Sequence, residues 1–175
     1  IAGAPLVFET LENIGYHRTY SEDTTITDSA AAGSAMACGE KFKNGEVCFH
    51  NDGRPYPPSI LELAKAKGMA TGLVATSTIT HATPATFGAH VGNRGCEQEI
   101  ARQYIQATQP DVLLGGGLLK FNATTPDHCG ASGDYISEAK ARGYTVVYTD
   151  QDMVNAVSKG VTKLLGLFNE DALTP

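Results

Sequence analysis

Short apolar runs alternate with amphipathic segments along most of this chain, and this alternation restricts its fold more than any other feature. Four short apolar runs closed by Gly, Thr or Asp are typical of buried strands: residues 71–76, 111–117, 145–149 and 163–168. Four segments with apolar residues at spacings of three and four, most of them ending in Gly, are typical of helices: residues 57–68, 96–108, 134–143 and 150–160. This order predicts an α/β fold with a largely parallel central sheet and helices on both faces.

The length of the chain limits how many domains it can form. A chain of 175 residues is long enough for one domain with a substantial core and too short for two ordinary ones. Residues 1–175 are therefore expected to belong to a single α/β domain. Because ligands of parallel sheets bind outside the carboxyl ends of the strands, we expect functional residues in the loops that follow the strands.

The charge and hydropathy of the chain exclude two classes of partner. The net charge is −6 and no basic cluster occurs, so a nucleic acid is not expected as a specific partner. Apolar residues make up 42% of the chain without a run long enough to span a bilayer, so a membrane span is not expected. Residue 1 is Ile and no signal segment precedes it, so the true start of the protein is expected to lie elsewhere, and membrane anchoring stays open.

The segment "TTITDSAAAGSAMACG" begins a helix with unusually small side chains. Residues 24–27 are all β-branched and predict a strand-like piece, and the Ala-rich run that follows predicts a helix that starts at Ser29. The first turn of a helix presents unpaired N–H groups that favour an anion. Two interpretations stay open at this point. Either Asp28 or Ser29 is simply a helix cap and residues 30–37 form a helix packed tightly against its neighbours, or the helix start binds an anionic ligand.

Residues 76–94, "TSTITHATPATFGAHVGNR", follow directly on a predicted strand and so occupy a place where ligands bind. We interpret this segment as a loop that carries His81, Thr83, His90 and Arg94. The planar guanidinium of Arg94 suits bidentate contact with a phosphate or a carboxylate. Taken singly, each of these histidines is more often structural than functional, and a solvated surface arginine is also the more frequent case.

Together, these two segments resemble the signature motifs of alkaline phosphatases. The family patterns "VTDSAA…TG" and "TGLVTTS…THATPA…AHV…R" read here "ITDSAAAGSAMACGEKFKNG" and "TGLVATSTITHATPATFGAHVGNR", in the same order and at the same spacing. The runs "DVLLGGG" and "KLLGLF" also look like strands of that family, so the resemblance covers nearly the whole chain. It implies an alkaline phosphatase-like fold and hydrolysis of phosphate monoesters through a phosphoseryl intermediate.

The resemblance also implies roles for five residues. Ser29 matches the serine that attacks phosphorus, and its oxygen would bind a metal ion. Arg94 matches the arginine that binds the phosphate, and Asp28 matches the aspartate that helps to hold this arginine. Thr83 matches a ligand of the magnesium site. His81 occupies a position near the third metal, where it would act mostly through water and could favour a softer metal than magnesium.

The resemblance implies two Zn²⁺ ions per complete site and one Mg²⁺ ion in a third site. Members of the family begin with a strand that carries a metal-bridging aspartate in a GDG-type turn, and no such motif precedes "PLVFETLENIGY" here. Their remaining zinc ligands follow the strand that matches "KLLGLF". The chain is therefore expected to be a partial sequence of a larger enzyme, and these 175 residues are expected to be inactive alone.

The chain contains four cysteines, Cys38, Cys48, Cys96 and Cys129, without the CxxC spacing of a zinc or redox motif. Disulfides and an oxidising compartment are therefore expected, which predicts a periplasmic, secreted or extracellular location. The resemblance implies a Cys48–Cys96 disulfide, which leaves Cys38 to pair with Cys129. It further implies small phosphomonoester substrates and a homodimer.

Two rival functions stay open at the level of sequence. A non-catalytic phosphate-binding fragment would explain the helix start and Arg94, but it would not require a serine at position 29. A metal-independent serine hydrolase could use His81 or His90 as its base. No GxSxG motif surrounds Ser29, so the sequence gives this second alternative little support.

Overall fold

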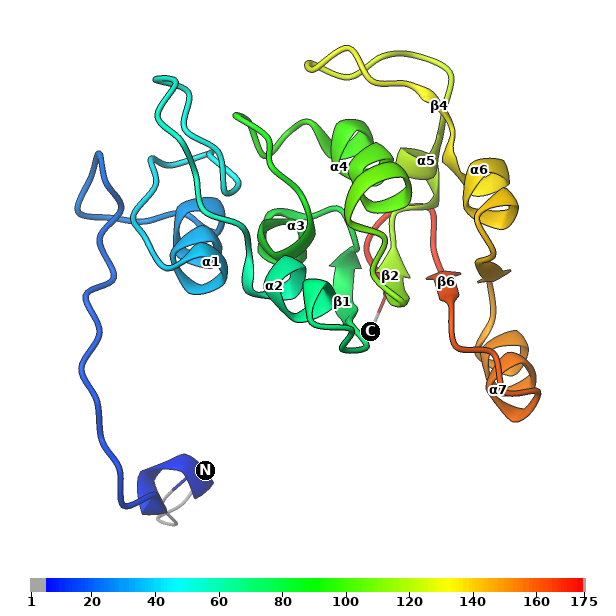
Figure 1. Ribbon diagram of the computed structural model, residues 1–175, viewed down its shortest axis with the longest axis horizontal. Coiled ribbons are helices and arrows are strands. Elements are labelled where there is room, and N and C mark those ends of the chain that lie inside the picture. Colours follow the sequence, from blue (N-terminus) through cyan, green and yellow to red (C-terminus); the bar gives the residue numbers. More distant parts are fainter. Residues whose placement is uncertain (1–5, 175) are drawn as a thin grey trace.

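A four-stranded parallel sheet forms the centre of the structure, a computed structural model that describes residues 6–174 (Figure 1). The strands lie in the order β1-β2-β6-β5, and each neighbouring pair is parallel. Their bounds are β1 (Gly72–Thr78), β2 (Val112–Gly116), β5 (Thr145–Val147) and β6 (Leu164–Leu167). Because each strand falls within or overlaps one of the four apolar runs, the predicted parallel sheet is confirmed. A short antiparallel pair, β3 (Asn122–Ala123) with β4 (Gly133–Asp134), lies apart from it.

Helices precede the first strand and occupy segments between the later strands, and each of the four predicted helical segments contains one. Their bounds are η1 (Val7–Thr10), α1 (Ser29–Cys38), α2 (Ile60–Ala66), α3 (Ala82–Gly88), α4 (Glu97–Gln103), η2 (Tyr104–Thr108), α5 (Leu118–Phe121), α6 (Tyr135–Ala141) and α7 (Asp150–Ser158). Side chains cap several of them. Ser59 and Glu62 form a reciprocal capping box at α2, and the Thr149 hydroxyl accepts the Asp152 amide at α7. Within residues 6–174, every helix is too short or too polar to cross a bilayer.

Two local predictions are wrong. Residues 24–27 form no strand, since no strand lies beside them in the described part of the chain; an amide side chain from residue 44 bonds their backbone instead. Part of the segment interpreted as a loop is a helix, α3, whose Pro84 falls in the first turn, where proline is tolerated. Its small residues gave no amphipathic pattern, and burial against neighbouring helices stabilises it.

Apolar side chains cover both faces of the sheet, but to different extents. On one face, Leu73, Leu113 and Leu165 pack in the main core together with residues of α4 and α6. On the other face, Leu114 and Leu164 pack with residues of α7. The prediction of helices on both faces is thus confirmed. However, Val74 in β1 is 75% exposed on this second face, although its apolar run predicts a buried strand.

The small residues of α1 let it pack closely against α3. Ala30, Ala31 and Ala37 are buried, and Gly33 faces Thr86 of α3. A Cβ atom at Gly33 would lie 2.8 Å from the Thr86 hydroxyl oxygen, which is closer than real Cβ contacts allow. Close packing against a neighbouring helix is therefore one reason why the side chains of α1 are small.

The predicted disulfide pairing is wrong. The bonds are Cys38–Cys48 and Cys96–Cys129, with Cα–Cα distances of 6.4 and 5.6 Å, in place of Cys48–Cys96 and Cys38–Cys129. Helix α1 ends at Gly39 in a left-handed conformation, so the chain turns back and brings Cys48 beside Cys38. The segment between β3 and β4 lies against the start of α4 and brings Cys129 to Cys96. Cysteine spacing alone cannot distinguish these connectivities.

Candidate active site

Asp28 caps helix α1 and also contacts two other segments. Its backbone is extended, with φ −89° and ψ 176°, and its Oδ1 accepts the Ala31 amide at 2.9 Å. Its Oδ2 accepts the backbone N–H of Gly45 at 3.1 Å and the Nη1 of Arg94 at 3.1 Å. The cap interpretation and the anion-site interpretation are therefore compatible, because the same carboxylate starts the helix and holds the arginine.

Arg94 lies between Asp28 and His81. Its Nη1 donates to Asp28, its Nη2 lies 3.1 Å from His81 Nε2, and its backbone N–H donates to the Gly45 carbonyl at 2.8 Å. Since a guanidinium has only donors, His81 Nε2 must accept this hydrogen bond, which puts the imidazole proton on Nδ1. The Arg94 side chain is 31% exposed, so its pairing with Asp28 contributes little stability and mainly fixes the orientation of the guanidinium.

Ser29 and Thr83 both lie in the first turns of helices, at the starts of α1 and α3. Ser29 is half-buried and Thr83 is exposed. Neither hydroxyl is hydrogen-bonded to another residue in the part of the chain that the structure describes, so both are available to a ligand. The chain of contacts from Asp28 through Arg94 to His81 brings Ser29, Arg94 and the start of α3 to one end of the packed α1–α3 pair.

His90 lies in a different environment. Its Nδ1 contacts the Cys48 carbonyl at 2.6 Å, its Nε2 contacts Glu62 at 3.0 Å, and its ring stacks on Tyr56. Burial works to lower the pKa of His90, but the bonds to Glu62 and to the Cys48 carbonyl outweigh it and raise that pKa above its usual value. Both ring nitrogens are engaged, and among residues 6–174 no histidine hydrogen-bonds the Ser29 hydroxyl.

The metal donors near Ser29 do not make a complete site. A zinc ion takes at least three protein ligands of the Cys, His or carboxylate type. In the described residues, such side chains converge in two places, neither of which includes Ser29, His81 or Thr83. One combines Cys96 and Cys129 with an aspartate, but both cysteines are disulfide-bonded. The described residues beside Ser29 therefore do not supply three such ligands at one point, and a two-zinc centre needs further ligands.

The second group of converging side chains is Glu22, Glu46 and His50. Other groups of the same chain already bind its carboxylates. The buried Glu46 carboxylate accepts the backbone N–H groups of Lys43 and Asn51 at 2.9 and 3.0 Å. Glu22 pairs with a neighbouring arginine, residue 54, whose Nη2 lies 2.7 Å from its Oε1. These carboxylates stabilise the local loop and are not a candidate metal centre.

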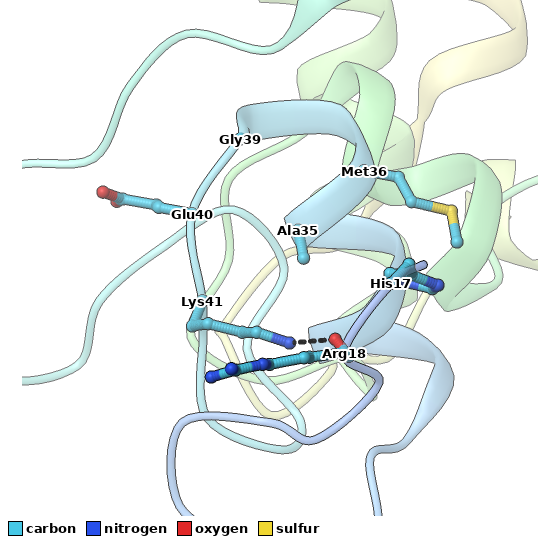
Figure 2. A pocket seen from close by; sticks show the side chains of 7 residues that line it. All are labelled: His17, Arg18, Ala35, Met36, Gly39, Glu40 and Lys41. Atoms are coloured by element: carbon cyan, nitrogen blue, oxygen red, sulfur yellow. Dashed lines mark hydrogen bonds between the residues drawn. The ribbon is translucent and has the colours of Figure 1, made fainter. Parts of the chain in front are cut away.

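A surface pocket of about 380 Å³ lies away from this site, against the C-terminal half of α1 (Figure 2). The Nζ of Lys41 points across it and donates to the Arg18 carbonyl at 2.7 Å. Its lining includes none of the predicted site residues; it consists of His17, Arg18, Ala35, Met36, Gly39, Glu40 and Lys41. A helix C-terminus carries the negative end of the dipole, so this end of α1 does not favour a phosphate.

Sequence reasoning missed the turn that joins the two halves of the site. Gly45 donates to Asp28 and accepts from Arg94, and Asn44 accepts the Asp28 backbone N–H at 2.9 Å. The dipeptide "NG" is a turn signal and could have located the turn. Its contacts join residues that are 16 and 49 positions apart in the chain, so no local pattern shows them.

Comparisons with known proteins agree on one family. The family model described as alkaline phosphatase matches residues 2–174. Alkaline phosphatase 3 of Bacillus subtilis is 41% identical over 167 residues, which cover 91% of this chain and 34% of that protein. Streptomycin-6-phosphate phosphatase of Streptomyces griseus is 37% identical over 191 residues, covering 95% of this chain and 42% of that protein. The chain thus spans about a third to two fifths of the length of these curated relatives.

Solved structures give the same result for the fold. Alkaline phosphatase from the Antarctic bacterium TAB5 superposes with a TM-score of 0.83 at 34% identity, over 99% of this chain and 48% of that one. A variant of the TAB5 enzyme in which a histidine is replaced by aspartate holds Mg in its M3 site; it superposes with the same TM-score at 33% identity, over 99% of this chain and 47% of that one. The expected fold is therefore confirmed.

Proposed function

The chain belongs to the alkaline phosphatase family, and on this premise we propose that its protein hydrolyses phosphate monoesters through a phosphoseryl intermediate on Ser29. One observation carries this proposal. Asp28, directly before Ser29, is paired with Arg94, so a nucleophile with a free hydroxyl and a guanidinium suited to phosphate belong to one connected site.

In the proposed reaction, the residues of this chain bind and orient the phosphate. Asp28 and His81 contact the two terminal nitrogens of the Arg94 guanidinium and fix its plane, and the remaining N–H groups of Arg94 bind two non-bridging oxygens in the proposed reaction. The amides at the start of α1 add positive potential beside Ser29. This arrangement neutralises charge on the equatorial oxygens of the transferred phosphoryl group, which is the main requirement for attack on a monoester dianion.

Ser29 needs an activator that the described residues do not supply, since no histidine hydrogen-bonds its hydroxyl. The alkaline phosphatase family is metal-dependent, and bound divalent cations supply Lewis-acid activation of a nucleophile and a leaving group. We assign the hydroxyls of Ser29 and Thr83 as donors toward these metals and His81 as a contact through water, with two Zn²⁺ and one Mg²⁺ in a complete site. The further ligands that this set needs lie outside the described residues, so the 175-residue piece alone is proposed to be inactive.

The proposed substrates are small phosphomonoesters and not nucleic acids, in keeping with the net charge of −6. The two disulfides fit an oxidising compartment, and we propose a periplasmic, secreted or extracellular location. A homodimer is also proposed. Exposed apolar side chains along the N-terminal segment, which Figure 1 shows extending away from the sheet, leave surface for such an interface: Leu6, Val7, Leu11, Ile14 and Tyr16.

The substitution Ser29→Ala in the full-length protein tests the proposal. We expect turnover of p-nitrophenyl phosphate to fall by at least about 10³-fold, while the affinity for inorganic phosphate stays within a few-fold, because Arg94 and the helix start remain. EDTA should abolish the activity of the wild-type protein. Ser21→Ala is the matched control, since within residues 6–174 the Ser21 hydroxyl donates to Asp23 and Thr24 of its own loop and to no other residue.

The same experiment distinguishes the two rival functions. A non-catalytic phosphate-binding protein would bind phosphate without any turnover in the wild type. A metal-independent serine hydrolase would keep its esterase activity in EDTA. Either result would contradict the proposed phosphatase.

A further inference from the structure

The turn that follows α1 contacts both parts of the proposed site. The Gly45 N–H donates to Asp28 Oδ2 at 3.1 Å, and the Gly45 carbonyl accepts the Arg94 amide at 2.8 Å. Gly45 has a φ of +88°, which favours glycine at this position. The residue before it, Asn44, contacts the segment that leads into Ser29. One turn therefore contacts both the residue before the nucleophile and the phosphate-binding arginine.

Asn44 binds the segment before Ser29 through both ends of its side-chain amide. Its Oδ1 accepts the Asp28 backbone N–H at 2.9 Å, and its Nδ2 donates to the Ile26 carbonyl at 2.9 Å. The two partners fix the orientation of the amide, since a backbone N–H can only donate and a carbonyl can only accept. In addition, the backbone N–H of Asn44 donates to Asp23 at 3.0 Å. Three hydrogen bonds from one residue thus fix the path of residues 23–28.

The turn itself is held independently of Asn44. The carboxylate of Glu46, which is 2% exposed, accepts the Lys43 amide, and Val47 pairs with Val91 through two backbone hydrogen bonds of 3.0 Å. The Cys38–Cys48 disulfide then joins the end of the turn to the end of α1. The backbone of the turn is therefore fixed without the Asn44 side chain, and the hydrogen bonds of that side chain hold Asp28 in a fixed place relative to the turn.

We propose that Asn44 is a positioning residue for the nucleophile: it fixes the backbone at Ile26–Asp28, so that Ser29 keeps its place relative to Arg94. This inference rests on the proposed function. Asn44 does not hold Arg94, which keeps Asp28, His81 and the Gly45 carbonyl as partners. Loss of Asn44 should therefore impair attack by Ser29 more than it impairs phosphate binding, because small misplacements of a nucleophile lower its rate strongly.

The test compares Asn44→Ala with Asn169→Ala in the full-length, metal-loaded protein. Asn169 is a matched control, since its side chain also bridges a backbone donor and a backbone acceptor, the Glu170 amide at 2.8 Å and the Ala172 carbonyl at 2.7 Å. For Asn44→Ala we expect kcat and the rate of phosphoseryl formation to fall by about 10- to 100-fold, with KM within about 3-fold of wild type. The melting temperature should fall no further than in Asn169→Ala, whose kcat stays within about 2-fold of wild type.

Other results would overturn the inference. A kcat for Asn44→Ala that matches the control, or a loss confined to KM, would show that Asn44 does not position Ser29. If Asn44→Ala does not fold, Asn44→Asp decides: it keeps the shape and the acceptor for Asp28 but loses the donor to Ile26, and a wild-type kcat would contradict the proposal. Ser29→Ala is measured in parallel, and if it retains turnover, the proposed function itself fails and the inference about Asn44 fails with it.

Discussion

Arg94 shows how single residues define this site. Its side chain contacts Asp28 through Nη1 and His81 through Nη2, and its backbone N–H donates to Gly45, so contacts with three other segments of the chain determine its position. Its partial exposure leaves the rest of the guanidinium open to a ligand. Asp28 combines the roles of helix cap and arginine partner, which makes the start of α1 and the position of Arg94 interdependent.

The substitution Arg94→Ala should therefore weaken both binding and catalysis. We expect KM for p-nitrophenyl phosphate to rise about 10-fold and kcat to fall about 10²-fold, because two contacts to the phosphoryl oxygens are lost. Steady-state kinetics check this, with Arg142→Ala as the control, since among the described residues the Arg142 side chain bonds Glu138 on α6 and no other. A change of similar size in both variants would contradict the role of Arg94.

His81 offers a second test at the residue scale. The substitution His81→Asp replaces a neutral nitrogen donor with a carboxylate, the ligand type that Mg²⁺ prefers. We expect the purified full-length variant to hold more Mg²⁺ relative to Zn²⁺ than the wild type, measured by elemental analysis. Unchanged metal content would contradict a role of His81 at the third metal site.

At the scale of elements, the packing of α1 on α3 determines where the two hydroxyls of the site lie. Gly33 allows the close approach of α1, and the Thr86 hydroxyl that it meets donates to the Thr83 carbonyl at 2.8 Å. This contact links the interior of α1 to the first turn of α3. The structure thus gives the small residues a packing role that the sequence alone left open.

The substitution Gly33→Ala should destabilise the protein. The new methyl would meet the buried and hydrogen-bonded Thr86, at a cost of about 1–3 kcal/mol that exceeds the gain of up to about 1 kcal/mol in helix propensity. Chemical denaturation measures the effect of Gly33→Ala on the free energy of unfolding, both in the wild type and in a Thr86→Ala background. In a Thr86→Ala background the clash is relieved, so Gly33→Ala should there be neutral or stabilising; an equal loss in both backgrounds would exclude the contact as the cause.

A pH-dependent contact joins α2 to the segment after α3. For Glu62, burial works to raise the pKa, but the hydrogen bonds from His90 and from the Ser59 amide lower it below its usual value. The pKa of His90 is raised, so the stability it contributes is complete below its unfolded value of about 6.5 and is lost as the pH rises through its folded value. The stability that Glu62 contributes is lost only as the pH falls through the lowered pKa of its carboxyl group.

Removal of this pair by His90→Gln should therefore reduce the free energy of unfolding by about 1 kcal/mol near pH 6 and by less above the raised pKa of His90. Urea denaturation of wild type and variant between pH 5.5 and 9 measures the difference. A constant difference across this range would exclude protonation of His90 as its source.

At the scale of the whole molecule, the periodicity of the sequence predicts the strands of the sheet. It does not predict the order of the strands or which elements cover them. All four apolar runs are strands because each is short, apolar and bounded by turn residues, yet the order β1-β2-β6-β5 depends on crossovers that no local pattern shows. The run that contains Val74 predicted burial on both faces, whereas that side chain is 75% exposed. Periodicity reports the apolar character of a strand and not which elements cover it.

The sequence could predict those residues of the candidate site that belong to recognisable motifs. The resemblance led to five residues, Asp28, Ser29, His81, Thr83 and Arg94. The structure connects three of them directly, Asp28, Arg94 and His81. It did not lead to Asn44, whose role depends on contacts between distant segments, and it gave the wrong disulfides. In both cases the deciding interaction is a long-range contact formed when the chain folds back.

The most direct test of the account is to identify the covalent intermediate in the full-length protein. The protein is mixed with p-nitrophenyl phosphate at low pH, quenched with acid within the first turnover, digested and analysed by mass spectrometry. The account predicts a phosphate group on the peptide that contains Ser29, located on Ser29 itself and absent from Ser29→Ala. Rapid hydrolysis with no phosphate on Ser29, or with phosphate on another residue, would contradict it.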